Sequence, residues 1–209
     1  MMSSGGVLAG YVQAGGASSR FGSDKALAEL GGQPMLLRMT TLVAFVAGSA
    51  SVVAPAGRYE GLGVNVVPDR WPGAGPLGGI VTALLHTAET APDCPWNLIV
   101  GCDLPFLTAG WLAFLADCAR RSAAQVLLPI SPEGAEPLCA CYRTAAASAL
   151  QAALAGGERK IQRAMATLAV ETLDEARWKR FDIAGRLFVN MNTAADLQLI
   201  RAYWEEGKT

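Results

Sequence analysis

Apolar runs alternate with small-residue breaks along this chain, as is typical of strands and helices that follow one another. Residues 8–13 form a short apolar run that predicts a first strand. A helix is predicted from Pro34 through residues 35–46, because proline is favoured at a helix start and apolar residues follow at helical spacing. Further strands are predicted at residues 51–55, 64–68, 96–102, 125–129 and 137–142. Further helices are predicted from Ile80 onward, at residues 110–121 and 144–155, around Arg163, and from Ala194 behind the N-cap Thr193.

The predicted strands are almost continuously apolar, and helices separate them. Strands of this kind are typical of a parallel sheet that is covered by helices on both faces. The first half of the chain therefore has a βαβ pattern. No internal repeat or linker divides the sequence, so we expect one α/β domain over residues 1–209.

Composition narrows the class of protein. The 209 residues are 52% hydrophobic and 17% charged, with a formal net charge of −1. Such a chain is globular, and its charge argues against a nucleic-acid partner. The five cysteines are odd in number and form no CxxC, so we expect reduced, mostly buried thiols. The first ten residues lack a basic region, and polar residues interrupt the apolar stretch at 35–55, so we expect a cytoplasmic protein without a membrane partner.

The segment 13–25 is rich in glycine, alanine and serine, and it follows the first predicted strand directly. Small residues let a backbone approach a ligand closely, and its N–H groups can face an anion. Arg20 and Lys25 add one forked and one compact positive charge. The segment therefore predicts a cradle for phosphate groups. A flexible connection between strand and helix would have a similar composition.

Two aspartates stand where predicted strands end. Asp103 follows the apolar strand at 96–102, and ligands of open α/β sheets bind beyond the carboxyl ends of strands. A carboxylate there can hold Mg²⁺, which often takes one or two carboxylates plus substrate phosphates. Asp69 has the same placement after 64–68 and could contact a base, a ribose or the outer shell of the metal. An aspartate that only caps a helix or turn is the alternative in each case.

Several familiar motifs are absent or misplaced. Residues 73–78 match GxGxxG, but they lie far from the first strand, and Pro72 and Pro76 make them a different loop. No GxxxxGK[ST] or GxSxG occurs, and the single histidine, His86, lies within a predicted helix. A reaction without a protein base suits an attacking group that is already an anion, such as a phosphate.

The motifs together resemble a known family. Residues 14–30, AGGASSRFGSDKALAEL, are similar to the nucleotidyltransferase signature AGGxSxRMGxDKAL. Five further blocks follow in family order: VVPD at 66–69, GPLGG at 75–79, GCDLPF at 101–106, EPLCACY at 136–142 and NMNTAADL at 190–197. The chain thereby resembles the molybdenum cofactor guanylyltransferases, a MobA-like branch of the NTP-transferases, over nearly its whole length. The resemblance implies a single-domain, Rossmann-like NTP-transferase fold.

The resemblance also implies an activity: Mg²⁺-dependent transfer of GMP from GTP to the phosphate of molybdopterin-bound molybdenum, with release of pyrophosphate. A molybdoenzyme or a chaperone is a possible partner. The implied nucleotide contacts are Gln13, Ala14, Gly15, Gly16, Lys25, Asp69 and Asp103. Arg20 and Lys25 would offset charge, and Asp103 would bind the metal. Asn190 and Asn192 would lie near the metal or the pterin substrate.

This sequence departs from the family pattern at three places. Gln13 stands where leucine is usual, Phe21 where methionine is common, and no asparagine occurs at 54–56. Recognition of the base is therefore open. A cytidylyltransferase for the same cofactor, or a nucleotidyltransferase for another phosphate acceptor, remains an alternative, and so does a nucleotide-binding regulator without catalysis.

Overall fold

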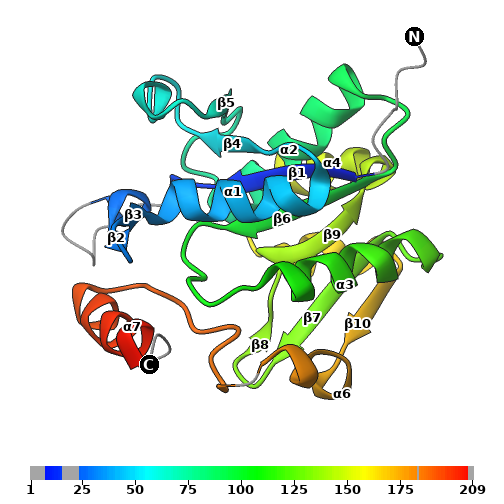
Figure 1. Ribbon diagram of the computed structural model, residues 1–209. Coiled ribbons are helices and arrows are strands. Elements are labelled where there is room, and N and C mark those ends of the chain that lie inside the picture. Colours follow the sequence, from blue (N-terminus) through cyan, green and yellow to red (C-terminus); the bar gives the residue numbers. More distant parts are fainter. Residues whose placement is uncertain (1–7, 16–23, 183, 207–209) are drawn as a thin grey trace, which may run out of the picture.

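The central sheet is the frame of the molecule. The computed structural model describes residues 8–15, 24–182 and 184–206. Eight strands of these segments form one sheet, with seven in the order β10-β7-β9-β6-β1-β4-β5 and β8 paired to β7 (Figure 1). The strands are β1 Leu8–Gln13, β4 Ser51–Ala54, β5 Asn65–Pro68, β6 Trp96–Gly101, β7 Val126–Ser131, β8 Gly134–Ala135, β9 Cys139–Arg143 and β10 Val170–Leu173.

Most neighbouring strands run parallel. β1 pairs in parallel with both β4 and β6, β4 with β5, and β7 with β10. Only β9 and β8 are antiparallel to their partners within the described sheet. Because β9 is antiparallel to both β6 and β7, those two strands point the same way. The expected mostly parallel α/β fold is confirmed.

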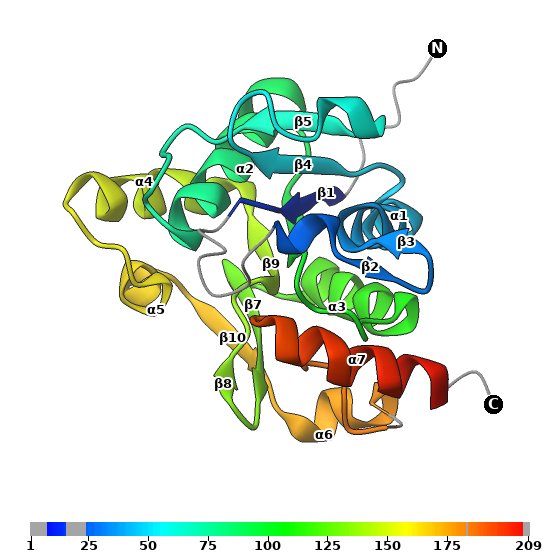
Figure 2. The same cartoon turned by 90° about the vertical axis from the view of Figure 1, so that its left-hand side faces the viewer.

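Helices cover both faces of the sheet. In Figure 1, α1 (Met35–Ala47) and α3 (Ala109–Arg121) lie in front of the strands, and α2 (Pro76–Thr90) and α4 (Ala147–Ala155) lie behind them. Figure 2 shows the same two layers from the side. The buried apolar side chains accordingly form two clusters, one against α1 and α3 and the other against α2 and α4. This explains the continuously apolar strands, since the central strands β1, β4, β6, β7 and β9 have buried side chains on both faces.

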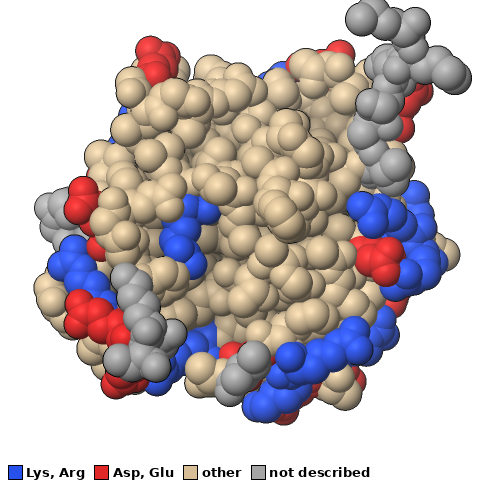
Figure 3. Space-filling view, viewed as in Figure 1, with Lys and Arg blue, Asp and Glu red and all other residues tan. Residues whose placement is uncertain are grey.

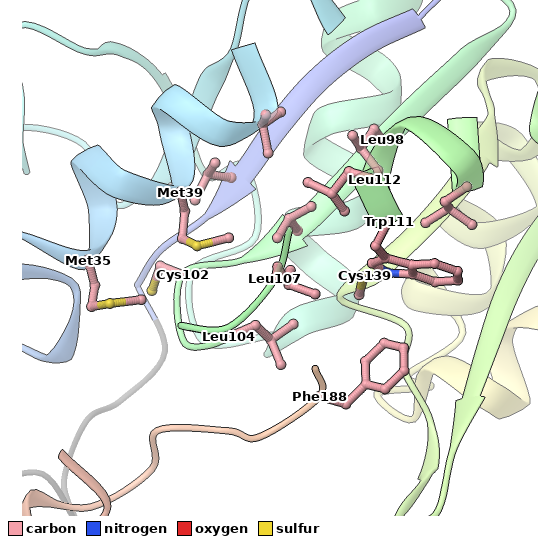
Figure 4. Close-up of a cluster of buried hydrophobic side chains, with 14 of the residues drawn as sticks. Met35, Met39, Leu98, Cys102, Leu104, Leu107, Trp111, Leu112, Cys139 and Phe188 are labelled. Atoms are coloured by element: carbon pink, nitrogen blue, oxygen red, sulfur yellow. Dashed lines mark hydrogen bonds between the residues drawn. The ribbon is translucent and has the colours of Figure 1, made fainter. Parts of the chain in front are cut away.

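The front cluster joins helices, sheet and C-terminal segment. Figure 4 shows Met35 and Met39 of α1 and Trp111 of α3 pointing into one apolar layer with Leu98 of β6, and Phe188 approaches from the chain beyond α6 (Glu175–Trp178). The Trp111 indole donates to the Cys139 sulfur at 3.3 Å. This layer packs directly beneath the chain that leaves β6, and it thereby fixes the position of Asp103.

The C-terminal helix α7 (Ala194–Glu206) begins at a capping box. The Thr193 hydroxyl accepts from the Asp196 N–H at 3.1 Å, and the Asp196 carboxylate accepts from the Thr193 N–H at 2.8 Å. The helix then packs on a hairpin of β2 (Glu29–Leu30) and β3 (Gln33–Pro34), where Arg201 donates to the Glu29 carbonyl. The predicted start of this helix is confirmed.

Some elements differ from the sequence-based expectation. The strand β10, the short helix α6 and the β2–β3 hairpin were not predicted. The helix expected at 144–155 begins as a 3₁₀ turn, Thr144–Ala146, before α4, and the short helix around Arg163 is α5, Ile161–Ala164. These elements are two to four residues long, which is too short for a hydrophobic period to reveal.

Charged side chains are unevenly spread over the surface. Figure 3 shows lysines and arginines gathered at the lower right of this face, over α6 and the C-terminal end of α3. Part of this charge is paired within the chain, since Arg121 bonds to Asp117 at 2.5 Å and Lys179 to Glu175 at 2.9 Å. None of the helices in the described segments is both long and apolar enough to cross a bilayer.

The five cysteines are all free and buried, as expected. Burial raises the pKa of the Cys102 thiol to about 12, and the same cause raises the pKa of Cys139 to about 12. The thiolate is the reactive form of cysteine, so the folded protein should not react with a thiol reagent at about pH 8. In the denatured chain, all five thiols should react, which is five equivalents of reagent per chain. Rapid labelling of the native protein would contradict this burial.

Candidate active site

A cavity of about 270 Å³ opens at the carboxyl edge of the sheet. Six described parts of the chain meet there: the end of β1, the residue Lys25, the end of β4, the segment from β5 into α2, the turn after β6, and the residue before β9. The lining residues are Gln13, Ala14, Gly15, Lys25, Val53, Asp69, Gly73, Gly75, Pro76, Cys102, Asp103 and Leu138. Strand register brings these segments together, because Gln13 pairs with both Val53 of β4 and Gly101 of β6.

Lys25 and Asp103 form an ion pair in this cavity. The Lys25 Nζ lies 2.5 Å from Asp103 Oδ2, and the two side chains are 19% and 15% exposed. Both residues follow β1 in the sequence, and they are 78 positions apart. At this degree of burial a charge is costly unless it is paired, and here the two opposite charges compensate each other inside the cavity. The two charges predicted to handle phosphate and metal therefore lie at one point.

Two features of the backbone position Asp103. A Cβ on Gly101 would lie 2.6 Å from Asp103 Oδ1, so only glycine leaves room for the carboxylate to fold back over the strand end. The Asp103 carbonyl accepts from the Met191 N–H at 2.9 Å. The aspartate is thus held by its own strand and by the segment that carries Asn190 and Asn192.

Lys25 sits on a short helical turn, Lys25–Leu27, that other side chains hold in place. Asp24 caps the turn, because its Oδ1 accepts from the Ala26 N–H at 3.1 Å. Its Oδ2 accepts from the Tyr59 hydroxyl at 2.8 Å and pairs with the Arg58 guanidinium. Burial, together with the Asp24 carboxylate, raises the pKa of the Tyr59 phenol and keeps it a donor. The lysine therefore stands on an anchored turn.

Asp69 lies at the opposite wall, where the chain passes from β5 to α2. Its Oδ1 accepts from the Trp71 N–H at 3.0 Å and lies 3.1 Å from the hydroxyl of Thr82, a fully buried residue of α2. Its N–H donates to the Ala54 carbonyl at 2.8 Å. These contacts fix the direction of the carboxylate relative to the cavity.

The end of β1 forms the entrance to the glycine-rich loop. The Ala14 N–H donates to the Val53 carbonyl at 2.9 Å, and Gly15 has a positive φ of 136°. A Cβ on Gly15 would also lie 2.6 Å from Pro55, so the turn requires glycine at this position. Gly16 and Arg20, which were predicted to contact phosphate, lie outside the described residues.

Asn190 and Asn192 do not line this cavity. They line a second one of about 530 Å³, together with residues of the β7–β8 turn and of the α6 region. The Asn190 side chain donates to the Phe188 carbonyl at 3.3 Å, and the Asn192 N–H donates to Asp196. The Met191 bond to Asp103 links the two cavities through the main chain.

Sequence reasoning missed part of the cavity wall. Gly73, Gly75 and Pro76 line it, although the GxGxxG match at 73–78 was set aside as a dinucleotide motif; the loop is a different one, but it does belong to the site. Leu138 also lines it, from the position just before β9. The useful signal was the position of this glycine and proline segment, directly after Asp69 and before a helix. The nearby Glu136 carboxyl is half-buried, which raises its pKa.

A lysine and two carboxylates lie in a cavity at the carboxyl edge of a mostly parallel sheet, which is the edge where open α/β proteins bind their ligands. Residues 10–172 match the model of the MobA-like NTP transferase domain. The chain therefore belongs to the MobA-like NTP transferase family, and it is a nucleotidyltransferase.

Relatives of known sequence agree with this assignment. A protein of Deinococcus radiodurans, described as a probable molybdenum cofactor guanylyltransferase, is 37% identical over 96% of this chain and 97% of its own. The molybdenum cofactor guanylyltransferase of Cupriavidus taiwanensis is 33% identical over 91% of this chain and 94% of its own. Both matches span nearly the full length of each protein.

Solved structures share the fold. The crystal structure of molybdopterin-guanine dinucleotide biosynthesis protein A from Archaeoglobus fulgidus has a TM-score of 0.77 and 25% identity, covering 94% of this chain and 98% of that one. CMP:2-keto-3-deoxy-manno-octonic acid synthetase in complex with CTP has a TM-score of 0.69 at 13% identity, covering 96% and 99%. The latter is similar in fold alone.

The place of Gly101 under the Asp103 carboxylate gives a stability prediction. Gly101→Ala should lower Tm by roughly 2 to 12 °C, since overpacking costs about 1–3 kcal/mol and each kcal/mol moves the Tm of a chain of this size by roughly 2–4 °C. Thermal unfolding followed by circular dichroism measures the loss. Gly61→Ala is the matched control, because a Cβ on Gly61 meets nothing within 4 Å.

A double substitution isolates the cause. In an Asp103→Ala background the carboxylate is gone, so Gly101→Ala should cost little further stability. An equal loss in both backgrounds would show that the new methyl group clashes with something other than the Asp103 side chain.

Proposed function

We propose that this chain, as a single domain in the cytoplasm, transfers GMP from GTP to the phosphate of molybdopterin-bound molybdenum, forming a guanine dinucleotide and pyrophosphate. The observation that carries the proposal is the Lys25–Asp103 pair within the cavity at the sheet edge. It occurs in a chain whose relatives at 30% identity or more carry the name of that activity.

The donor nucleotide would occupy the cavity between β1 and α2. Lys25 would leave Asp103 for the triphosphate, because phosphate oxygens offer a compact ammonium several negative partners. The turns at Gly15 and Gly75 let the backbone approach the nucleotide closely. Asp69, directed by the Trp71 N–H and Thr82, would accept from a hydroxyl or amine of the nucleoside. Gly16 and Arg20 would complete the phosphate cradle.

Asp103 suits a magnesium ion. The ion takes oxygen ligands and often only one or two carboxylates beside substrate phosphates. Asp69 and Asp103 are the carboxylates that line the cavity. In the described segments, no three or more His, Cys, Asp or Glu side chains lie together so that they could hold a metal ion. When bound, Mg²⁺ would neutralise phosphate charge at the reacting centre. Asp103 would hold it once Lys25 has moved to the nucleotide.

The acceptor would approach from the second cavity. Asn190 and Asn192 line that cavity, and Met191 between them bonds to Asp103. A pterin bears amine and carbonyl groups that asparagine side chains can both accept from and donate to. This arrangement would place the acceptor phosphate beside the carboxylate that faces the donor. The acceptor is thus positioned by the segment that supports Asp103.

The chemical step needs charge neutralisation and alignment more than proton transfer. An oxygen of the acceptor phosphate, already an anion, would form a bond to the α-phosphorus of GTP while the bond to the bridging oxygen breaks, and pyrophosphate leaves with the electron pair. Lys25 and Arg20 would offset the charge that accumulates. His86 takes no part, because it does not line the cavity and its Nδ1 lies 2.7 Å from the Tyr11 hydroxyl.

Asp103→Asn tests the role of the carboxylate. The amide keeps the shape but loses the negative charge, so turnover should fall at least about a hundredfold. Pyrophosphate release in the presence of GTP, molybdenum cofactor and Mg²⁺ measures the effect. Removal of the metal with a chelator should abolish release by the unsubstituted protein. Asp93→Asn, at an exposed position outside both cavities, is the control and should retain full activity.

Unchanged turnover in Asp103→Asn, or full activity after removal of the metal, would contradict the proposal. A protein that binds nucleotide but releases no pyrophosphate with any cofactor preparation would be a regulator without catalysis.

The choice of nucleotide can be tested without the acceptor. A cytidylyltransferase is the second candidate, because the chain has no asparagine near Ala54 and has Gln13 where the family usually has leucine. Calorimetric titration with GTP, CTP, ATP and UTP in the presence of Mg²⁺ should give the tightest binding for GTP. Tight binding of CTP alone would assign the cytidylyltransferase activity instead.

A further inference from the structure

Gln13 lines the donor cavity, and its main-chain groups are already hydrogen-bonded to neighbouring parts of the sheet. Its carbonyl accepts from the Cys102 N–H at 3.1 Å, and the next N–H, of Ala14, donates to Val53. The sheet therefore uses these backbone groups to join β1 to its neighbours. The side-chain amide is the part of Gln13 that is left for a ligand.

The amide of Gln13 is held against the first turn of α2. Its Nε2 donates to the Pro76 carbonyl at 3.2 Å. A Cβ on Gly79 would lie 2.1 Å from Nε2 and 2.4 Å from Cδ, so the amide occupies the space that a side chain at 79 would take. The bond to Pro76 also fixes the polarity of the amide, because the nitrogen must face the carbonyl and the oxygen must point elsewhere.

The amide oxygen has no partner. Gln13 Oε1 is buried and makes no hydrogen bond, and Trp204 Nε1 is the one other buried side-chain nitrogen or oxygen in this state within the described segments. Buried acceptors are almost always paired, since an unpaired one loses its bonds to water and gains nothing. Gln13 lines the proposed nucleotide cavity, so a donor on the ligand is the natural partner.

We propose that Gln13 selects the nucleobase, and that its amide oxygen accepts from the ring N1–H of guanine. This inference rests on the proposed function. Adenine and cytosine carry an unprotonated ring nitrogen at the corresponding edge, and its lone pair would face that of the amide oxygen. The oxygen would thus attract guanine and repel those two bases. To reach the base, the amide would rotate away from its ligand-free orientation and give up the bond from Nε2 to the Pro76 carbonyl. The broad terminal torsion of glutamine permits this rotation.

Gln13→Leu tests the proposal, because leucine is apolar and similar in size. Calorimetric titration with Mg²⁺ should show GTP binding about tenfold weaker than in the unsubstituted protein, which is the effect of one lost hydrogen bond to a buried acceptor. Binding of ATP and CTP should be unchanged or tighter, so the preference for GTP should fall by at least the same factor. Gln33→Leu, at an exposed position of the β2–β3 hairpin, is the matched control.

Stability supplies an independent readout. Gln13→Leu removes an unpaired buried oxygen, which favours stability, together with the bond from Nε2 to Pro76, which opposes it. The Tm of the ligand-free variant should therefore stay close to that of the unsubstituted protein. Gln13→Met, which keeps an unbranched side chain, should show the same loss of preference and serves if the leucine variant does not fold.

The outcomes are distinct. Failure of the unsubstituted protein to bind GTP would overturn the proposed function itself. Normal GTP binding with unchanged preference in both variants would overturn only the role of Gln13. Equal weakening of GTP, ATP and CTP would also overturn it, since that result marks a general loss of cavity shape.

Discussion

The parallel register of β1 with its two neighbours is the constraint on which the site depends. Gln13 pairs with Val53 on one side and with Gly101 on the other, so β1, β4 and β6 end at the same level. The chain leaves the sheet there three times within a few ångströms. Residues that are far apart in sequence, such as Lys25 and Asp103, come into contact because the strands that deliver them are aligned. The core of methionine, leucine and tryptophan side chains beneath that edge keeps the alignment rigid.

The site combines side chains that are firmly held by hydrogen bonds with one ion pair that can change its partners. Asp69 and Asp24 are held by several hydrogen bonds each, and both are tied to neighbouring elements. Lys25 and Asp103, in contrast, hold one another, with the Lys25 Nζ 2.5 Å from Asp103 Oδ2. An ion pair of this kind keeps two charges in place without committing either to a fixed structural role. The cavity is therefore preorganised in shape while its two principal charges can still exchange partners.

The principal strands and helices could be predicted from the sequence, because each long element has a clear hydrophobic pattern. β10 could not, since only one of its four residues is buried and it lies at the sheet edge. Asp69 and Asp103 were predicted to lie at the site from strand-end position alone, and both line the cavity. Their exact partners depend on tertiary contacts: the bond from Thr82 to Asp69 and the pair with Lys25 follow from packing of elements that spacing does not reveal. The position of the Gln13 amide over Gly79 could not be predicted for the same reason, because it also depends on tertiary packing.

The reversed direction of β9 has a consequence for how this fold acquires new residues at its site. The parallel strands β1, β5 and β6 contribute the residues that follow them, but β9 runs the other way and so contributes a residue that precedes it. Leu138 reaches the cavity for this reason, and Glu136 lies near Asp103. Insertions upstream of β9 would remodel the site, whereas insertions downstream of it would emerge at the far edge of the sheet. Divergence of substrate within this architecture can therefore be accommodated in the short β7–β9 connection while β1, β5 and β6 stay unchanged.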